Sequence, residues 1–100
     1  MTATRAERIR ATLEREFAPV AVQVVDESGR HVGHAGNPDG RGETHYAVTL
    51  VSPAFAGMGR LARSRAVHAA LAEEFATGLH ALSLRLLSPE EAQPRDGPGA

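Results

Sequence analysis

The sequence contains no cysteine and no tryptophan. Without cysteine the chain can form no disulfide, cannot use a thiolate as a nucleophile, and cannot bind a soft metal through thiolates of its own. Metal chemistry of that kind would need sulfur ligands from a partner. Aromatic residues are also few, with one tyrosine and three phenylalanines, so side chains on which single-stranded bases could stack are scarce.

Strong net charge and long apolar segments are lacking as well. The formal net charge is -1 and the pI is about 6.5, so no overall positive field favours nucleic acid. No apolar run approaches the roughly 20 residues that a membrane helix needs, and the charged residues near the start are unlike a signal peptide. We therefore expect a cytoplasmic protein that does not contact membranes. The 100 residues suffice for one domain with a modest core.

Two segments have the apolar spacing of amphipathic helices. The first is expected over residues 4–17, where Thr4 and Glu7 match a capping box. The second is expected as one continuous helix over residues 60–76. Its predicted buried stripe consists of Leu61, Val67, Leu71 and Phe75.

Three segments, over residues 20–25, 46–51 and 78–87, alternate apolar and polar residues as half-buried strands do. The first two strands should pair antiparallel, and the second and third should be parallel because a helix connects them. These elements predict a single α+β domain with the order α-β-β-α-β, in which both helices cover one face of a three-stranded mixed sheet. The residues expected on the other, more exposed face are Ala21, Gln23, Thr49, Ser83 and Arg85.

Two loops and a short terminal turn complete the predicted domain. Residues 26–45 form an unusually long connection that contains five glycines. Phe55 should anchor the loop over residues 52–59 to the core. Ser88 should cap one helical turn after the last strand. We expect residues 93–100 to form a flexible tail, because they contain no large apolar residue.

The predicted topology brings four of the five histidines to one end of the sheet. Parallel strands begin at the same edge, so His45 and His80 should be neighbours at the starts of the second and third strands. His31 and His34 lie in the long loop that ends at His45. We expect His45 to be structural and His68, in the second helix, to be a partly buried packing residue.

The start of the second predicted helix is basic, with Arg60, Arg63 and Arg65, while Glu73 and Glu74 lie near its end. This polarity opposes the helix dipole, so it indicates either a surface for a partner or nucleic acid, or simply a solvated charged face.

Signals for catalysis or for nucleic-acid binding are weak. The Gly-x-x-Gly loop of nucleic-acid-binding K-homology domains is not matched, because Gly57 and Gly59 are one residue too close together. The sequence also has no paired nucleophile constellation and no phosphate-binding glycine motif, so we expect that the protein is not an enzyme.

Several short motifs follow one another along the chain in an order typical of one family. They are Asp26-Glu27-Ser28 with His31, Glu43-Thr44-His45-Tyr46, Val51-Ser52-Pro53-Ala54-Phe55, the helical segment over residues 60–72, and Leu79-His80-Ala81-Leu82. Together they resemble the BolA family, and the resemblance runs from about Ile9 to Glu91. The glycine-rich loop with its His-x-x-His spacing resembles the histidine-type members. The resemblance implies a BolA-like domain over residues 1–92 with a variant of the class II K-homology (KH) fold.

The resemblance implies two alternative roles. The first is an adaptor that pairs with a monothiol glutaredoxin, shares a [2Fe-2S] cluster with it, and takes part in iron–sulfur trafficking or in iron and redox sensing. The alternative is a DNA-binding transcriptional regulator of morphology and stress genes, which would use the KH-like fold and the basic helix face of Arg60, Arg63 and Arg65.

For the first role, the resemblance implies that His80 is a cluster ligand and that His31 is the second, with His34 as the alternative. Because the chain has no cysteine, thiolates would come from the partner and its bound glutathione, and the isolated chain would hold no cofactor. Alone, the chain is expected to be a monomer or a weak homodimer. One departure from the family pattern is Ala92, which stands where a tryptophan usually follows Pro-Glu-Glu.

Overall fold

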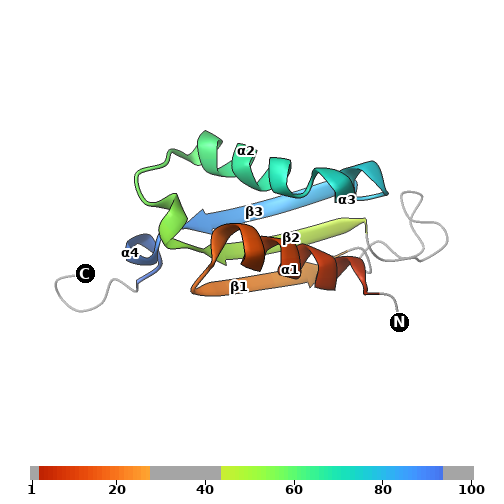
Figure 1. Cartoon of the computed structure of the whole chain (residues 1–100), viewed down its shortest axis with the longest axis horizontal. Coiled ribbons are helices and arrows are strands. Elements are labelled where there is room, and N and C mark those ends of the chain that lie inside the picture. Colours follow the sequence, from red (N-terminus) through yellow and green to blue (C-terminus); the bar gives the residue numbers. More distant parts are fainter. Residues whose placement is uncertain (1–2, 28–43, 94–100) are drawn as a thin grey trace.

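The computed structural model describes residues 3–27 and 44–93, and Figure 1 shows how their elements are arranged. In chain order these elements are α1 (Arg5–Phe17), β1 (Ala21–Asp26), β2 (His45–Val51), the single 3-10 turn η2 (Pro53–Phe55), α2 (Arg60–Ala70), α3 (Ala72–Ala76), β3 (Ala81–Leu87) and α4 (Pro89–Ala92). The tail predicted over residues 93–100 lies, apart from Gln93, outside the described residues, as does most of the predicted long loop.

The three strands form one mixed sheet in the order β1-β2-β3. Strands β1 and β2 are antiparallel, with Val24 opposite Val48. Strands β2 and β3 are parallel, with His45 opposite Ala81. The prediction of a small α+β domain with a three-stranded mixed sheet is therefore confirmed, while the KH-like description stays a prediction.

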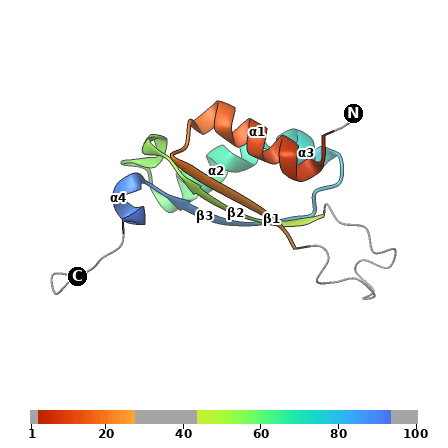
Figure 2. The same cartoon turned by 90° about the horizontal axis from the view of Figure 1, so that it is seen from below.

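Helices α1, α2 and α3 lie on one face of this sheet, and α4 lies beyond the end of β3 (Figure 2). Residues of β2 that face the helices are buried, and these are Tyr46, Val48 and Leu50. The other face carries the residues predicted to be the more exposed ones: Ala21, Gln23, Ser83 and Arg85 are exposed, and Thr49 is half-buried. The period-2 alternation of the strands thus separates a core face from a solvent face.

Helix α1 begins and ends where its local sequence signals predict. The Glu7 backbone N–H donates to Thr4 Oγ1 over 3.1 Å, and the Thr4 N–H donates to Glu7 Oε1 over 2.8 Å. At the other end Ala18 adopts a left-handed conformation, with a φ of 43°, immediately before Pro19. Ile9 and Leu13, one helical turn apart, are fully buried against the sheet.

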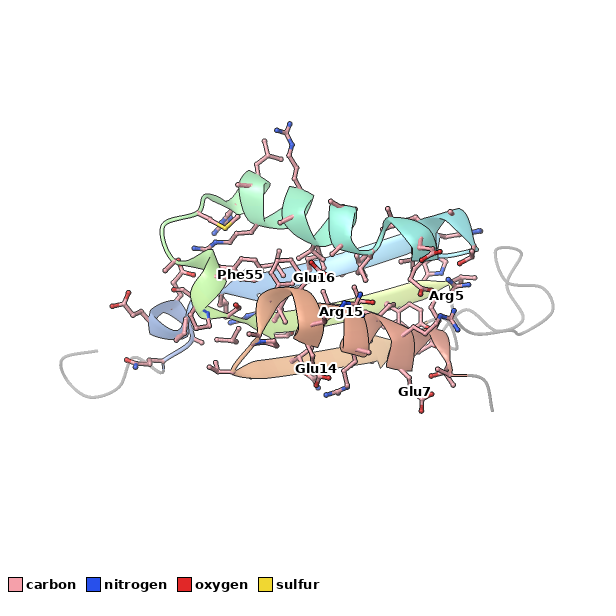
Figure 3. All side chains as sticks on the ribbon, in the orientation of Figure 1. Arg5, Glu7, Glu14, Arg15, Glu16 and Phe55 are labelled. Atoms are coloured by element: carbon pink, nitrogen blue, oxygen red, sulfur yellow. The ribbon has the colours of Figure 1, made fainter. Side chains whose placement is uncertain are left out.

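Phe55 anchors the loop after β2 in the core, as predicted. Its side chain is fully buried, and its ring centroid lies 5.3 Å from that of Phe17 at the end of α1 (Figure 3). Ser52 supports the same turn, because its hydroxyl accepts from the Ala54 N–H and donates to the Phe17 carbonyl. The first helix and the loop after β2 are thereby joined.

The second helix is not continuous over residues 60–76, as the sequence predicted, but divides at Leu71 into α2 and α3. Leu71 has a φ of -103° and a ψ of 17°, and its carbonyl accepts from both the Glu74 and the Phe75 N–H groups. The shorter of these bonds spans three residues, which tightens the helix locally. Leu71 at the break and Glu74 in α3 are both buried.

The predicted buried stripe of this helix is also wrong at its first position. Leu61 is 63% exposed, whereas Arg63 is 7% exposed. Arg63 precedes Val67 by four residues, and Val67 precedes Leu71 by four residues, so the three side chains lie on the same face of the helix. With about 100° per residue, position 61 lies on the far side of the helix from position 63. The helix therefore directs an arginine toward the core region and a leucine into solvent.

Candidate functional site

His80 lies in the connection between α3 and β3 and is exposed. Strand β3 was predicted to begin at residue 78 but begins at Ala81. The backbone N–H groups of His80 and Ala81 both donate to the Thr44 carbonyl, over 2.8 and 3.0 Å. His80 is thus fixed by its backbone at the first contact between β2 and β3.

His45 is the neighbour of His80, as the predicted topology requires. The two ring centroids are 6.3 Å apart and the rings meet edge to face at 63°. His45 Nδ1 lies 2.8 Å from Thr44 Oγ1, which orients this ring. His31 and His34 lie outside the described residues, so their approach to this end of the sheet stays a prediction. Among residues 3–27 and 44–93, no three histidine or carboxylate side chains are grouped to hold a metal ion.

The residues before His80 direct it outward. Leu79 is 3% exposed and its N–H donates to the Glu74 carbonyl over 2.9 Å. Gly78 has a φ of 132°, a conformation that glycine tolerates and other residues rarely adopt. Because Leu79 is anchored in the core and the chain turns at Gly78, the side chain of His80 is presented to solvent.

An arginine from the first helix holds this turn together (Figure 3). Arg5 Nη1 donates to the Glu74 carbonyl over 3.0 Å and to Glu74 Oε1 over 2.7 Å. Arg5 Nη2 donates to the Thr77 carbonyl over 2.9 Å. The carbonyls at a helix C-terminus have no partner within the helix, and a guanidinium can satisfy them. Arg5 therefore caps α3 from a position 69 residues away in the sequence.

Arg8 completes the group that we name the Arg5 cluster, formed by Arg5, Arg8, Glu74 and Thr77. Its Nε donates to Glu74 Oε2 over 3.0 Å, and its Nη2 donates to Glu74 Oε1 over 3.1 Å. The hydrogen bond from Arg8, and then the charges of Arg8 and Arg5, lower the pKa of Glu74 although burial opposes this shift. Sequence analysis did not find this cluster, because no local pattern relates Arg5 to Glu74.

The predicted basic surface at the start of α2 is wrong for one of its three arginines. Arg60 and Arg65 are exposed, but the Arg63 side chain is buried and forms four hydrogen bonds. Its Nε donates to the Met58 carbonyl over 2.9 Å, and its Nη1 donates to the Leu86 carbonyl over 3.0 Å. Arg63 fastens α2 to the end of β3 and is not available to nucleic acid.

Glu91 is the charged partner of Arg63. Arg63 Nη1 donates to Glu91 Oε1 over 2.6 Å, and Arg63 Nη2 donates to Glu91 Oε2 over 3.1 Å. The Arg63 hydrogen bond is the main reason that the pKa of Glu91 falls to about 2, and the same bond raises the pKa of Arg63. Glu91 also accepts from the Ser88 N–H, which gives α4 the predicted capping box.

His68 is exposed, which differs from its predicted partial burial. Its ring stacks on Phe75, with centroids 5.3 Å apart and planes at 16°, and its Nδ1 lies 2.9 Å from the Ser64 carbonyl. It packs along the outside of α2 and α3, away from the core.

Residues 13–91 match the family model described as BolA-like protein. The chain therefore belongs to the BolA-like family. An uncharacterised protein from Sinorhizobium sp. is 45% identical over 85 residues, which cover 85% of this chain and 91% of that protein. The DNA-binding transcriptional regulator BolA of Escherichia coli strain K12 is 44% identical, and the match covers 85% of this chain and 76% of the regulator.

A plant relative matches in both sequence and structure. The chloroplastic protein BOLA1 of Arabidopsis thaliana is 45% identical, over 92% of this chain and 58% of the plant protein. The solved structure of BolA1 from Arabidopsis thaliana superimposes with a TM-score of 0.81 at 41% identity, covering 93% of this chain and all of that one. The plant relative is described as chloroplastic, and the cytoplasmic location of this chain stays a prediction. In the described residues, no helix is long and apolar enough to cross a membrane.

Proposed function

We propose that this BolA-like domain is an adaptor that pairs with a monothiol glutaredoxin and contributes His80 to a [2Fe-2S] cluster shared by the two proteins. The observation that carries the proposal is the exposed imidazole of His80 beside His45, held by strand pairing at one end of the sheet. The family resemblance supports the partner and the cluster type. The role would lie in iron–sulfur trafficking or in iron and redox sensing.

The donor set of the chain fits a shared cluster better than one held by this chain alone. Imidazole is a suitable ligand for cluster iron, and histidine in place of cysteine raises the cluster potential. The chain has no cysteine, and its described residues contain no group of three potential ligands. Thiolates would therefore be supplied by the glutaredoxin and its glutathione, and the cluster when bound would supply one-electron redox chemistry.

The residues of this chain each have a separate task in the proposal. His80 offers a ring nitrogen and must be neutral to do so, because protonation removes the donor lone pair. The His80 side chain is exposed and its ring meets that of His45 edge to face, so a partner can approach it from solvent. The Thr44 carbonyl and the buried Leu79 fix the backbone on either side. His31, or alternatively His34, is proposed as the second ligand.

The ligand proposal is tested on the complex co-expressed with a monothiol glutaredoxin. Replacing His80 with alanine should abolish the parent visible absorption and circular dichroism spectrum or shift its bands, because one iron loses its imidazole. His68→Ala is the matched control, since it removes another exposed histidine on a different element. His31→Ala, His34→Ala and His45→Ala complete the series and identify the second ligand.

Two results separate the parts of the proposal. If the His80→Ala complex keeps the parent spectrum and cluster lifetime, His80 is not a ligand. If the parent chain does not co-purify with the glutaredoxin, the partnership itself is wrong. Amide spectra of each isolated variant show whether the domain has kept its fold.

A second candidate function is DNA binding, which is favoured by the exposed Arg60 and Arg65 and by the name of the Escherichia coli relative. Affinity for duplex DNA should fall with rising salt, and Arg60→Glu with Arg65→Glu should weaken it by about tenfold or more. Arg10→Glu with Arg15→Glu, an equal charge change at two exposed positions of α1, should have less effect. Unchanged affinity in the double variant would exclude this surface.

A further inference from the structure

Strand β3 is an open edge of the sheet. The strand order is β1-β2-β3, so in the described part of the chain β3 has β2 on one side and no strand on the other. An unpaired edge presents backbone donors and acceptors in a row, and natural proteins usually cover or block such edges. The direction of these groups shows what the edge of β3 can bind.

The even-numbered residues of β3 direct their backbone groups outward. The Ala81 N–H donates to the Thr44 carbonyl, and the Leu87 carbonyl accepts from the Ser52 N–H, so odd-numbered residues face β2. Successive residues of a strand alternate in direction, which leaves Leu82, Leu84 and Leu86 facing away from β2. The bond from Arg63 Nη1 to the Leu86 carbonyl confirms this direction.

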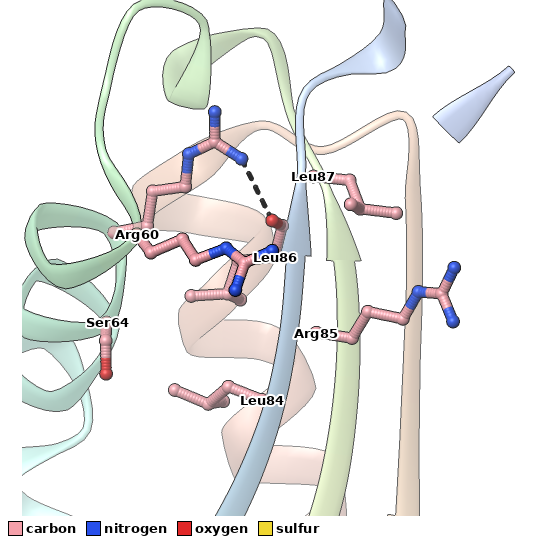
Figure 4. A pocket seen from close by; sticks show the side chains of 7 residues that line it. Arg60, Ser64, Leu84, Arg85, Leu86 and Leu87 are labelled. Atoms are coloured by element: carbon pink, nitrogen blue, oxygen red, sulfur yellow. Dashed lines mark hydrogen bonds between the residues drawn. The ribbon is translucent and has the colours of Figure 1, made fainter. Parts of the chain in front are cut away.

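A groove runs along this edge beside α2 (Figure 4). Its volume is about 500 Å³, and it is lined by Arg60, Arg63, Ser64, Leu84, Arg85, Leu86 and Leu87. Figure 4 shows Leu84 pointing toward α2 and Arg85 pointing away from it, so side chains of both sheet faces border the groove. The backbone edge of β3 therefore lies along the groove itself.

The groove carries uncompensated positive charge. Arg60 and Arg85 are exposed, and neither forms an ion pair within residues 3–27 and 44–93. Arg63 is neutralised by Glu91, and no acidic side chain lines the groove. Carboxylates placed here could form charge-assisted hydrogen bonds, one with Arg60 on the α2 side and another with Arg85 on the opposite side of β3.

We propose that the free edge of β3 binds an extended acidic segment of a partner protein as a fourth strand, with its carboxylates against Arg60 and Arg85. The Leu84 N–H and carbonyl and the Leu86 N–H supply the backbone pairing. The Leu86 carbonyl is already bonded to Arg63, so the added strand ends there. Main-chain bonds give affinity in this mode of recognition, and side-chain contacts give selectivity.

Two other occupants fit this edge less well. Nucleic acid would bring phosphate acceptors to the N–H groups and guanidinium groups but would leave the outward carbonyl of Leu84 without a donor. A second copy of β3 would bring a second pair of Arg60 and Arg85 to an edge that already carries both, and like charges repel. An acidic peptide supplies both backbone donors and negative charge.

The surface is separate from the proposed ligand end. His80 precedes β3 and Leu86 lies near its end, which at about 3.3 Å per residue places the two roughly 20 Å apart. The proposal does not depend on the cluster, and one domain has room for both contacts.

The probe is a synthetic peptide with two adjacent glutamates between valines, because neighbouring side chains of a strand point to opposite faces and can meet Arg60 and Arg85 separately. It is titrated into the isotope-labelled full chain and followed by amide NMR. We expect the amide signals of Leu84 and Leu86 to shift and their hydrogen exchange to slow. Arg60→Glu and Arg85→Glu should each weaken binding by about tenfold, whereas Arg65→Glu, on the same helix but outside the groove, should leave it unchanged.

Two control peptides test the proposal with the parent chain, without any substitution in the protein. The same peptide methylated on its backbone nitrogens retains its charge but loses its N–H donors, and lysine in place of glutamate reverses the charge. Binding should be lost with both. Equal binding of the methylated peptide would show attraction by charge alone and would overturn strand addition. Displacement of the acidic peptide by duplex DNA, together with weaker binding of DNA in Arg85→Glu, would assign the surface to nucleic acid instead.

Discussion

Replacing Gly78 with alanine is expected to destabilise the domain by about 3 kcal/mol. Two effects add up to this loss: the strain of an alanine at positive φ, and a steric clash of its Cβ. Gly78 has a φ of 132°, and a Cβ at this position would lie 2.9 Å from Arg5 Nη2. The guanidinium cannot move away freely, because it is bonded to the Thr77 carbonyl and to Glu74. Chemical denaturation of the purified chain measures the loss.

Gly57 provides the matched control for this substitution. It also has a positive φ, of 79°, but a Cβ there meets nothing within 4 Å. Gly57→Ala should therefore cost only the backbone term, about 1 kcal/mol. Equal losses in the two variants would mean that the contact with Arg5 contributes nothing. If the larger loss is found, amide signals of Leu79 and His80 should also change most in Gly78→Ala, because these residues follow the strained turn.

Replacing Glu74 with glutamine should destabilise the domain by a similar amount, about 3 kcal/mol, because it removes the negative charge between two arginines while keeping the side-chain shape. Glu74 is 8% exposed and binds both Arg5 and Arg8. Glu73→Gln, one residue earlier and exposed, should change stability by less than about 0.5 kcal/mol. A loss no larger than that of the control would show that the charge of Glu74 is not needed.

The parent chain and Glu74→Gln can also be compared as a function of pH. The folded state lowers the pKa of Glu74, so its charge stabilises the domain above the pKa of glutamate in the unfolded chain. That contribution is lost progressively as the pH falls below about 4.3. The stability difference between the parent and Glu74→Gln should therefore be full at neutral pH and shrink on acidification. A difference that stays constant through this range would contradict the role of the carboxylate charge.

Local sequence signals were sufficient for the first helix, for the existence of the three strands and for the way the strands pair. The capping boxes at Thr4 and Ser88 are made within four residues of the chain, so their residue types alone specify them. Alternation along β1, β2 and β3 identifies the buried face, and the helix between β2 and β3 requires their parallel pairing. The proximity of His45 and His80 followed from that topology, because both precede or begin paired strands.

Hydrophobicity alone failed where a charged side chain replaces an apolar one in the stripe of a helix. Leu61 was predicted to be buried because it is apolar, but Arg63 is the residue that precedes Val67 by four positions and so lies on the buried face. An arginine can be buried there because Met58, Leu86 and Glu91 supply acceptors for its donors. Those acceptors come from three different parts of the fold, so they are visible only in the folded structure.

Long-range contacts account for the remaining differences. The Arg5 cluster joins the first turn of α1 to the end of α3, and neither segment carries a signal for the other. The groove beside β3 likewise depends on the packing of α2 against an edge strand. For the ligand site, His31 and His34 could be named from spacing and resemblance, but their positions fall outside the described residues.

The span between Arg5 and Glu74 also bears on the order in which the domain is completed. The antiparallel pairing of β1 with β2 joins neighbouring strands, whereas the parallel pairing of β2 with β3 must await the intervening helices. The bond from Arg5 to Glu74 closes a separation of 69 residues, and the entropic cost of closing a loop rises with its length. His80 lies beside both long-range contacts, so we expect its surroundings to be completed late in folding and to respond to changes in the first turn of α1.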